Sequence, residues 1–237
     1  MIQTPVPATV RMTKLLLAPM APLQYLLDTP GITHEHCLNQ AYNTLLNDGK
    51  EDVHTFFRPY HAWIRKGLFW ADRGWKNVYH FYTNPDNPSK PSWPGASAEA
   101  QFYYNQALLN FPKDVLKGMF YLGAALHIIQ DMCVPHHSKG MLFDGHQEFE
   151  KWAGIHWQEF STVEQGFYPN FHHLSQWIDH NALVSGSFYP LVSTQAQSNK
   201  DTYSEAANTL IPLTIQSTAG FLDFVRNELS EVTLRLV

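Results

Sequence analysis

The sequence predicts an all-α, single-domain helical bundle, and three observations lead to this fold class. Apolar residues recur at helical spacing along most of the chain, whereas no segment of useful length alternates apolar and polar residues as a strand would. The 237 residues suffice for one well-buried domain, and no internal repeat divides them. With 44% apolar and only 16% charged residues, intrinsic disorder is excluded.

The first thirty residues differ from the remainder, so we separate residues 1–30, an N-terminal arm or degenerate leader, from a helical domain over 31–237. Arg11 and Lys14 precede a short apolar stretch, as in a signal peptide, but Pro19 and Pro22 interrupt that stretch. It is also too short to span a bilayer. Two interpretations stay open, namely an export signal and an arm packed on the domain.

The first half of the domain predicts helices followed by a loop. Thr33 is a candidate N-cap for a helix over 34–46, where apolar residues fall at helical spacing. Residues 51–70 suggest two short helical pieces around Pro59, a residue that fits the first turn of a helix. Residues 83–96 carry four prolines among Asn, Ser and Gly, which predicts a surface loop between helices.

The second half predicts longer helices. Continuous helical patterns cover 98–109 and 115–132, and the second is apolar nearly all the way round, so we expect it at the centre of the bundle. Further helices are expected over 147–158, 173–184 and 203–236. Pro212 should kink or divide the last of these.

The composition singles out histidine. The chain has 13 histidines beside only 16 lysines and arginines. A formal charge of −5 gives no basic field for a nucleic-acid backbone, so we expect no stable nucleic-acid partner. The only cysteines, Cys37 and Cys133, cannot form a disulfide framework and show no CxxC spacing. The fold must therefore rest on its core, and the histidines need a chemical explanation.

His127 and Asp131 interrupt the most apolar of the predicted helices. They are four residues apart, so they lie on the same helical face. Burying a carboxylate without compensation costs several kcal/mol. A hydrogen-bonded His–Asp pair in the core and a pair that binds a divalent cation are both compatible with this spacing.

The residues that follow favour the cation. Pro135, His136 and His137 come just after the predicted helix end, and His146 and Glu150 repeat the i, i+4 spacing of an imidazole and a carboxylate. Zinc prefers imidazole nitrogen together with carboxylate oxygen. Upstream, His34, Asp72 and His80 are single residues that are unremarkable taken one at a time.

Taken together, these motifs resemble the bacterial zinc-dependent phospholipase C family, which is related more distantly to single-strand-specific zinc nucleases. The resemblance is carried by a Phe-Tyr-Leu-Gly run at 120–123, HxxxD at 127–131 and Pro-x-His at 135–137. HxxxE at 146–150 is similar to the phospholipase branch, since the nuclease branch has HxxxD there. It extends to the segments Thr33-His34, Asn39, Ala41, Ala71-Asp72, His80-Phe81-Tyr82 and Ser217-Thr218-Ala219-Gly220-Phe221.

The resemblance implies an all-α bundle of that family's type, with residues 31–237 as the catalytic domain and zinc as cofactor. By matched position, His80, His127 and Asp131 would hold one zinc, with Asp72 as a ligand or general base. A second ion would lie among His137, His146 and Glu150, and Asp131 would bridge to a third ion at His34. The implied metal ligands are His34, Asp72, His80, His127, Asp131, His137, His146 and Glu150.

The sequence does not specify the number of ions. The family completes its third site with a mature N-terminal Trp about ten residues before the matching His, and residues 22–26 contain no Trp. His36 or Cys37 could replace it, or the site could hold two ions. Arg73 and Asn77 stand where family members place aromatic residues around a choline group, so headgroup specificity is also open.

The activity implied by the resemblance is zinc-dependent hydrolysis of phospholipids of the phospholipase C type. A metal-bound hydroxide would attack the phosphodiester, with Asp72 taking the proton or positioning the water. The partner would be a phospholipid, contacted transiently at a membrane surface, with the oligomeric state undetermined. The alternatives are a zinc-dependent single-strand nuclease or phosphomonoesterase of the same fold, and a non-catalytic protein with structural zinc. Family resemblance implies a secreted or periplasmic location, and a cytoplasmic one follows if the N-terminal segment is not a signal.

Overall fold

The computed structural model describes residues 31–73, 79–83, 95–141, 143–161, 164–194 and 199–234, and these ranges contain helices and no strand. The predicted all-α fold class is therefore confirmed. The α-helices are α3 (Ile32–Asn47), α4 (Glu51–Phe57), α5 (His61–Ala71), α6 (Ala96–Asn110), α7 (Val115–Asp131), α8 (Pro135–Lys139), α9 (His146–His156), α10 (Leu174–Gly186), α11 (Tyr189–Val192) and α12 (Lys200–Leu234). Two 3₁₀ turns, η2 (Arg58–Tyr60) and η4 (Trp157–Phe160), follow α4 and α9.

Besides the last two residues of the helix expected over 203–236, three predicted features fall wholly or partly outside these ranges. They are the arm or leader over 1–30, most of the loop predicted over 83–96, and Asn77. The described helices lie close to the predicted segments, with ends displaced by a few residues. The short helices α8 and α11 had no counterpart in the sequence analysis.

The start of α3 corrects one prediction. The helix begins at Ile32 with Gly31 in the cap position, and no side chain caps it, so the assignment of Thr33 as N-cap is wrong. The aromatic ring of Phe69 packs against Gly31, at 3.2 Å from where a Cβ would stand. This packing against α5, and not a side-chain cap, accompanies the start of the helix.

The last helix, α12, corrects the prediction made for Pro212. α12 is a single helix of 35 residues with Pro212 inside it, so of the two predicted outcomes division of the helix is wrong, and a kink at Pro212 stays a prediction. A proline within a helix costs about 3 kcal/mol or more. Here Leu210, Ile211 and Leu213 around it are all buried. Burial of these neighbours outweighs the proline and keeps the helix continuous.

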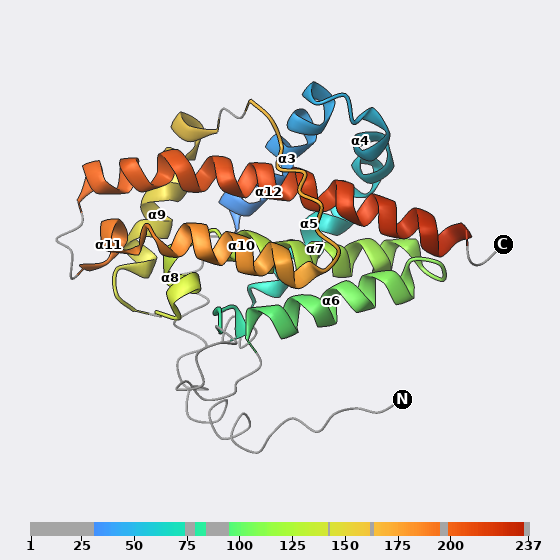
Figure 1. Ribbon diagram of the computed structural model, residues 1–237, viewed down its shortest axis with the longest axis horizontal. Helices are drawn as coiled ribbons and strands as arrows, with labels where there is room; N and C mark the ends of the chain where they lie inside the picture. Colours follow the sequence, from blue (N-terminus) through green and yellow to red (C-terminus); the bar gives the residue numbers. More distant parts are fainter. Residues whose placement is uncertain are drawn as a thin grey trace, which may run out of the picture.

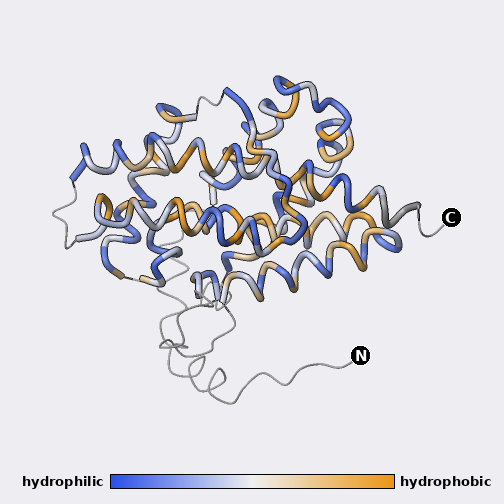
Figure 2. Tube along the Cα trace, in the orientation of Figure 1, coloured by the Kyte–Doolittle hydropathy of each residue, from blue (hydrophilic) through white to orange (hydrophobic). Residues whose placement is uncertain are grey.

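α7 is the central helix, as its apolar sequence predicts. It packs mainly against α5 and α6, while α12 lies along the length of the bundle beside α10 (Figure 1). Apolar and polar residues alternate along the outer helices, as expected where one helical face is buried (Figure 2). At one end of the molecule α8, α9 and α11 gather (Figure 1).

Glycines set the spacing of α5 and α7. A Cβ at Gly67 of α5 would stand 1.7 Å from the carbonyl oxygen of Phe120, and a Cβ at Gly123 of α7 would stand 1.9 Å from that of Ile64. Only glycine permits so close an approach of two helix backbones. The contact fixes the middle of α5 against the middle of α7.

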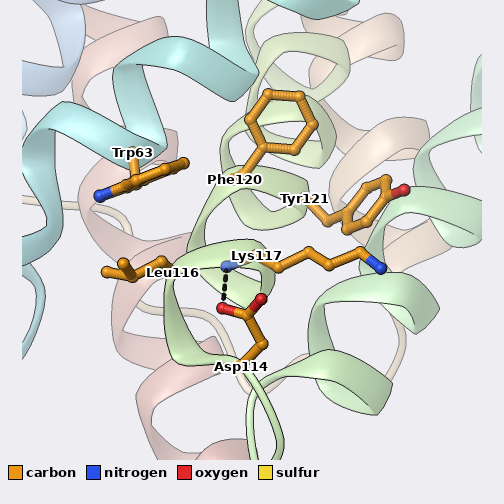
Figure 3. A pocket seen from close by; sticks show the side chains of 6 residues that line it. All are labelled: Trp63, Asp114, Leu116, Lys117, Phe120 and Tyr121. Carbon is orange, nitrogen blue, oxygen red and sulfur yellow. Dashed lines mark hydrogen bonds between the residues drawn. The ribbon is translucent and has the colours of Figure 1, made fainter.

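The N-terminal end of α7 begins with a side-chain cap. Asp114 accepts a hydrogen bond of 3.0 Å from the backbone N–H of Lys117, satisfying one free donor of the first turn (Figure 3). A shallow depression of about 390 Å³ lies here, lined by Trp63, Asp114, Leu116, Lys117, Phe120 and Tyr121. It contains none of the eight predicted metal ligands, which lie toward the opposite end of α7.

In the part of the chain that the structure describes, no helix has both the length and the apolar character needed to cross a bilayer.

Candidate metal centre

The C-terminal end of α7 brings the HxxxD motif into the core. His127 and Asp131 are both buried, and His127 Nε2 lies 3.2 Å from Asp131 Oδ2. Asp72 follows the last residue of α5 and reaches the same imidazole, with its Oδ1 4.0 Å from His127 Nε2. The glycine contact between α5 and α7 thus brings Asp72 to within ligand distance of His127.

Asp131 is the common contact of the cluster. Its carboxylate lies 2.8 Å from His80 Nδ1, through Oδ2, and 3.4 Å from His34 Nε2, through Oδ1. His34 comes from the first turn of α3, and His80 from the segment between α5 and α6. Residues remote in sequence therefore converge on one buried carboxylate.

A second carboxylate gathers the other two histidines. His146 is the first residue of α9, and its Nε2 lies 2.9 Å from Oε1 of Glu150, one turn later. His137 Nε2 lies 3.4 Å from the same oxygen. His137 Nδ1 donates a 3.0 Å hydrogen bond to the backbone carbonyl of His80, which leaves Nε2 to face Glu150.

Among the residues that the structure describes, three groups of side chains have candidate ligand atoms within 4.8 Å of one another. Each of the eight residues expected as ligands belongs to at least one group. The groups are His34, His127 and Asp131; Asp72, His80 and His127; and His137, His146 and Glu150. The third group matches the set implied by the resemblance. The first two differ from the implied sets, because Asp131 is grouped with His34 and His127, and Asp72 with His80 and His127. Which residues share an ion stays a prediction.

The chemistry of the cluster fits a bound cation. Both ring nitrogens of His80, both of His127 and Oδ2 of Asp131 are buried without a hydrogen-bond partner. The 2.8 Å approach of His80 Nδ1 to Asp131 Oδ2 lacks the alignment of a hydrogen bond. Unsatisfied buried polar atoms are costly. Imidazole nitrogens and carboxylate oxygens are the ligands that zinc prefers, so the donor set fits zinc.

The electrostatics keep both acids ionised. Burial would raise the pKa of Asp131, but His127 and His137 outweigh burial and hold that pKa well below its usual range. Desolvation likewise opposes ionisation of Glu150, and hydrogen bonds from His137 and His146 lower its pKa in spite of this. Carboxylates must be ionised to bind a metal, so both acids are in the ligand form.

The imidazoles differ among themselves. Desolvation lowers the pKa of His80 to about 4, and desolvation followed by the charge of His127 lowers that of His34. These two rings are therefore neutral and offer lone pairs. Desolvation also opposes a charge on His137, but Asp131 and a hydrogen bond to Glu150 raise its pKa to about 9, so His137 must release a proton to bind a metal.

Three residues close to the predicted ligands in sequence, His136, His36 and Cys37, make other contacts. His136 Nε2 is 2.8 Å from the carbonyl oxygen of Asp144, and its ring stacks on His146. The ring of His36 lies against that of Trp157, with 3.3 Å between ring centroids and a tilt of 31°. Cys37 is buried, and desolvation raises its thiol pKa to about 12, which disfavours the thiolate that a metal requires. None of these side chains belongs to the three groups found among the described residues.

Gln130 is a residue of the centre that the sequence motifs did not predict. This side chain is buried, and its Oε1 lies 2.8 Å from His34 Nδ1. A signal was present, because Gln130 is polar and adjoins Asp131 in an otherwise apolar run. Its importance depends on α3 packing nearby, which spacing along α7 cannot reveal.

A family comparison agrees with this centre. Residues 33–183 match the model of a family described as zinc dependent phospholipase C. The match spans more than half of the chain. The chain belongs to the zinc-dependent phospholipase C family. Zinc dependence is therefore a property of this chain's family, and the matched range includes all eight candidate ligands.

Solved structures show the same fold for this family member. It is similar to the alpha toxin of Clostridium absonum, with 18% identity and a TM-score of 0.71. The alpha toxin of Clostridium perfringens from an avian strain gives 17% identity and the same TM-score, 0.71. Each alignment covers 84% of this chain and 64% of the toxin chain, so the chain spans less than two thirds of either toxin. Comparison with curated proteins gave no match.

Proposed function

We propose that this chain is a hydrolase that cleaves phospholipids at the phosphodiester, as a phospholipase C does, with two or three zinc ions as cofactor. The observation that carries the proposal is the convergence of five imidazoles and three carboxylates into three overlapping or adjoining groups. A phosphodiester is an anion whose hydrolysis needs charge stabilisation more than a covalent nucleophile. Family membership adds the lipid as the substrate class.

The buried residues of the cluster are suited to holding the cations. Asp131 and the imidazoles of His80, His127 and His137 are buried, and that of His34 is partly exposed, so these side chains can hold cations in a fixed arrangement with little access for bulk water. Zinc, when bound, supplies Lewis acidity toward the phosphate and lowers the pKa of water. The negative charge of Asp131 also keeps the site attractive to cations before any substrate arrives.

Asp72 is the residue suited to proton transfer. Its side chain is 38% exposed, in contrast to the buried Asp131, so it lies where the cluster meets solvent. A carboxylate in that place can accept a proton from water or orient it, and the conjugate acid can pass the proton on to solvent. We assign Asp72 the role of general base or water-positioning group.

Contact with the membrane is assigned to an exposed aromatic residue. Phe143 is 78% exposed and precedes His146 by three residues, in the segment between α8 and α9. A phenyl ring can enter the interfacial region of a bilayer beside the metal centre. Such a contact is small, so binding to lipid would be transient.

A substrate panel tests the proposal. The zinc-loaded protein is given vesicles of phosphatidylcholine or phosphatidylinositol, single-stranded DNA, and a simple phosphomonoester. We expect release of diacylglycerol and a phosphorylated alcohol, and loss of this activity on chelation of zinc. Hydrolysis of single-stranded DNA or of the monoester without any action on lipid would overturn the phospholipase assignment in favour of a nuclease or phosphomonoesterase.

The role of Asp72 has a separate test. Asp72→Asn should abolish turnover while leaving the zinc content largely unchanged, because the amide cannot take a proton. Asp114→Asn is the matched control, since asparagine caps a helix as well as aspartate and Asp114 lies at the other end of α7. Unchanged hydrolysis in Asp72→Asn would remove this residue from the mechanism.

A further inference from the structure

We propose that Gln130 and Thr218 are positioning residues that fix the imidazole of His34 with its proton on Nδ1, so that Nε2 serves as a metal ligand. The inference rests on the metal site of the proposed function but not on the identity of the substrate. It begins from a buried polar chain that joins α3, α7 and α12.

This polar chain consists of two hydrogen bonds that share the side-chain amide of Gln130. Gln130 is 2% exposed, and its Oε1 lies 2.8 Å from Nδ1 of His34. Its Nε2 donates a hydrogen bond of 3.0 Å to the hydroxyl of Thr218, which is 0% exposed. The side-chain amide of Gln130 therefore bridges two helices that come from opposite ends of the sequence.

The direction of the amide decides the tautomer of His34. A carboxamide has a donor end and an acceptor end, and a neutral imidazole has one nitrogen of each kind. With the NH₂ group engaged by Thr218, the carbonyl oxygen faces His34, and only a protonated Nδ1 can donate to it. A threonine hydroxyl inside a helix commonly donates to the carbonyl of the preceding turn, which leaves its oxygen free to accept from Gln130.

The free nitrogen then faces the cluster. His34 Nε2 lies 3.4 Å from Asp131 Oδ1 and belongs to the group formed with His127 and Asp131. If the amide were reversed, its NH₂ group would face Nδ1, the proton would move to Nε2, and the lone pair needed by a cation would be lost. Residues that hydrogen-bond the far nitrogen of a ligating histidine orient it in this manner.

A neighbouring pair shows that the arrangement is specific. Ser217, adjacent to Thr218, is equally buried, but it exchanges hydrogen bonds with Asn181 of α10, which also donates to the carbonyl of Ile129. That network stabilises helix packing and does not reach His34. Thr218 and Ser217 are thus adjacent buried hydroxyls on one helix, of which only Thr218 acts on the metal cluster.

The test combines spectroscopy with zinc affinity, both in the absence of lipid. In the zinc-loaded protein, nitrogen NMR of His34 should show a proton on Nδ1 and zinc on Nε2. Zinc titration against a competing chelator should show about 10- to 100-fold weaker binding at the His34 site in Thr218→Val and Gln130→Leu. Gln130→Glu keeps an acceptor for Nδ1 and should retain more of the affinity than Gln130→Leu. Ser217→Ala is the matched control and should bind zinc as the parent protein does.

Each outcome decides the proposal. A proton on Nε2 of His34, or zinc bound without His34, would overturn it. So would parent-like affinity in Thr218→Val, or an equal loss in Thr218→Val and Ser217→Ala, which would indicate a packing effect. Support requires weaker zinc binding in Thr218→Val together with, in the zinc-free protein, a larger fraction of His34 protonated at Nε2 than in the zinc-free parent. A protein that passes this test but leaves phospholipid intact would contradict the proposed function alone.

Discussion

Replacement of Asp131 by asparagine perturbs the centre most directly. The carboxylate approaches four imidazoles, those of His34, His80, His127 and His137, at distances between 2.8 and 3.9 Å. Asparagine has the same shape, so Asp131→Asn leaves no cavity, removes the charge and replaces one acceptor oxygen by an NH₂ donor. The effect therefore measures the electrostatic contribution of the acid to the cluster.

The expected magnitude follows from burial. Removing one partner of a buried ion pair costs about 3–5 kcal/mol. For a chain of this length, 1 kcal/mol shifts the melting temperature by about 2–4 °C, so we expect a decrease on the order of 10 °C. Zinc present at a thousandfold excess over its dissociation constant stabilises a protein by about 4 kcal/mol, and the variant should lose that stabilisation at any ion bound by Asp131.

Thermal unfolding with and without a chelator, together with elemental analysis, makes the measurement. The parent protein should melt at lower temperature after chelation, and Asp131→Asn should show a smaller shift and at least one zinc fewer per chain. Asp223→Asn is the control, because it breaks the ion pair with Lys50, 3.0 Å apart and away from the imidazoles, at a cost of about 1 kcal/mol or less. Parent-like zinc content and chelator response in Asp131→Asn would refute the assignment of these residues to a metal centre.

Three further predictions concern packing, ligand identity and lipid contact. Gly123→Ala should destabilise the fold by about 3 kcal/mol or more in urea unfolding, because its Cβ would stand 1.9 Å from the carbonyl oxygen of Ile64; an unchanged midpoint would contradict the close helix contact. Cys37→Ala should leave the zinc content unchanged by elemental analysis, whereas loss of one ion would make the thiol a ligand. Phe143→Ala should reduce hydrolysis of vesicles but not of a soluble short-chain phospholipid, with Leu109→Ala as the exposed control on α6; equal effects on both substrates would argue against interfacial contact.

The helices could be predicted from the sequence because their signals are local. The continuous apolar pattern over 115–132 predicts a central helix, and α7 occupies that place. Exceptions arise where tertiary packing outweighs a local signal. Thr33 has the chemistry of an N-cap but lies inside α3, whose start is packed against Phe69. Pro212 has the chemistry of a helix breaker but lies in a helix held by its buried neighbours.

In the candidate site, too, some contacts follow from local spacing and others depend on tertiary packing. His127 with Asp131, and His146 with Glu150, could be paired from spacing because four residues make one helical turn. Nothing along the chain specifies that His34 should meet Asp131, since 97 positions separate the two in the printed sequence. Their contact at 3.4 Å depends on how α3 packs near α7, and only the family resemblance gave a reason to expect it.

The polar chain from Thr218 to His34 connects a helix that holds none of the candidate ligands with the metal centre. Helix α12 contributes no residue to the three metal groups described, yet through Gln130 it contacts a candidate ligand. Its buried hydroxyls serve two purposes, since Ser217 joins α12 to α10 while Thr218 reaches the metal cluster. A residue near the C-terminus can thus govern a ligand near the start of the domain, because an amide that must satisfy both of its ends transmits a choice of tautomer from one helix to another.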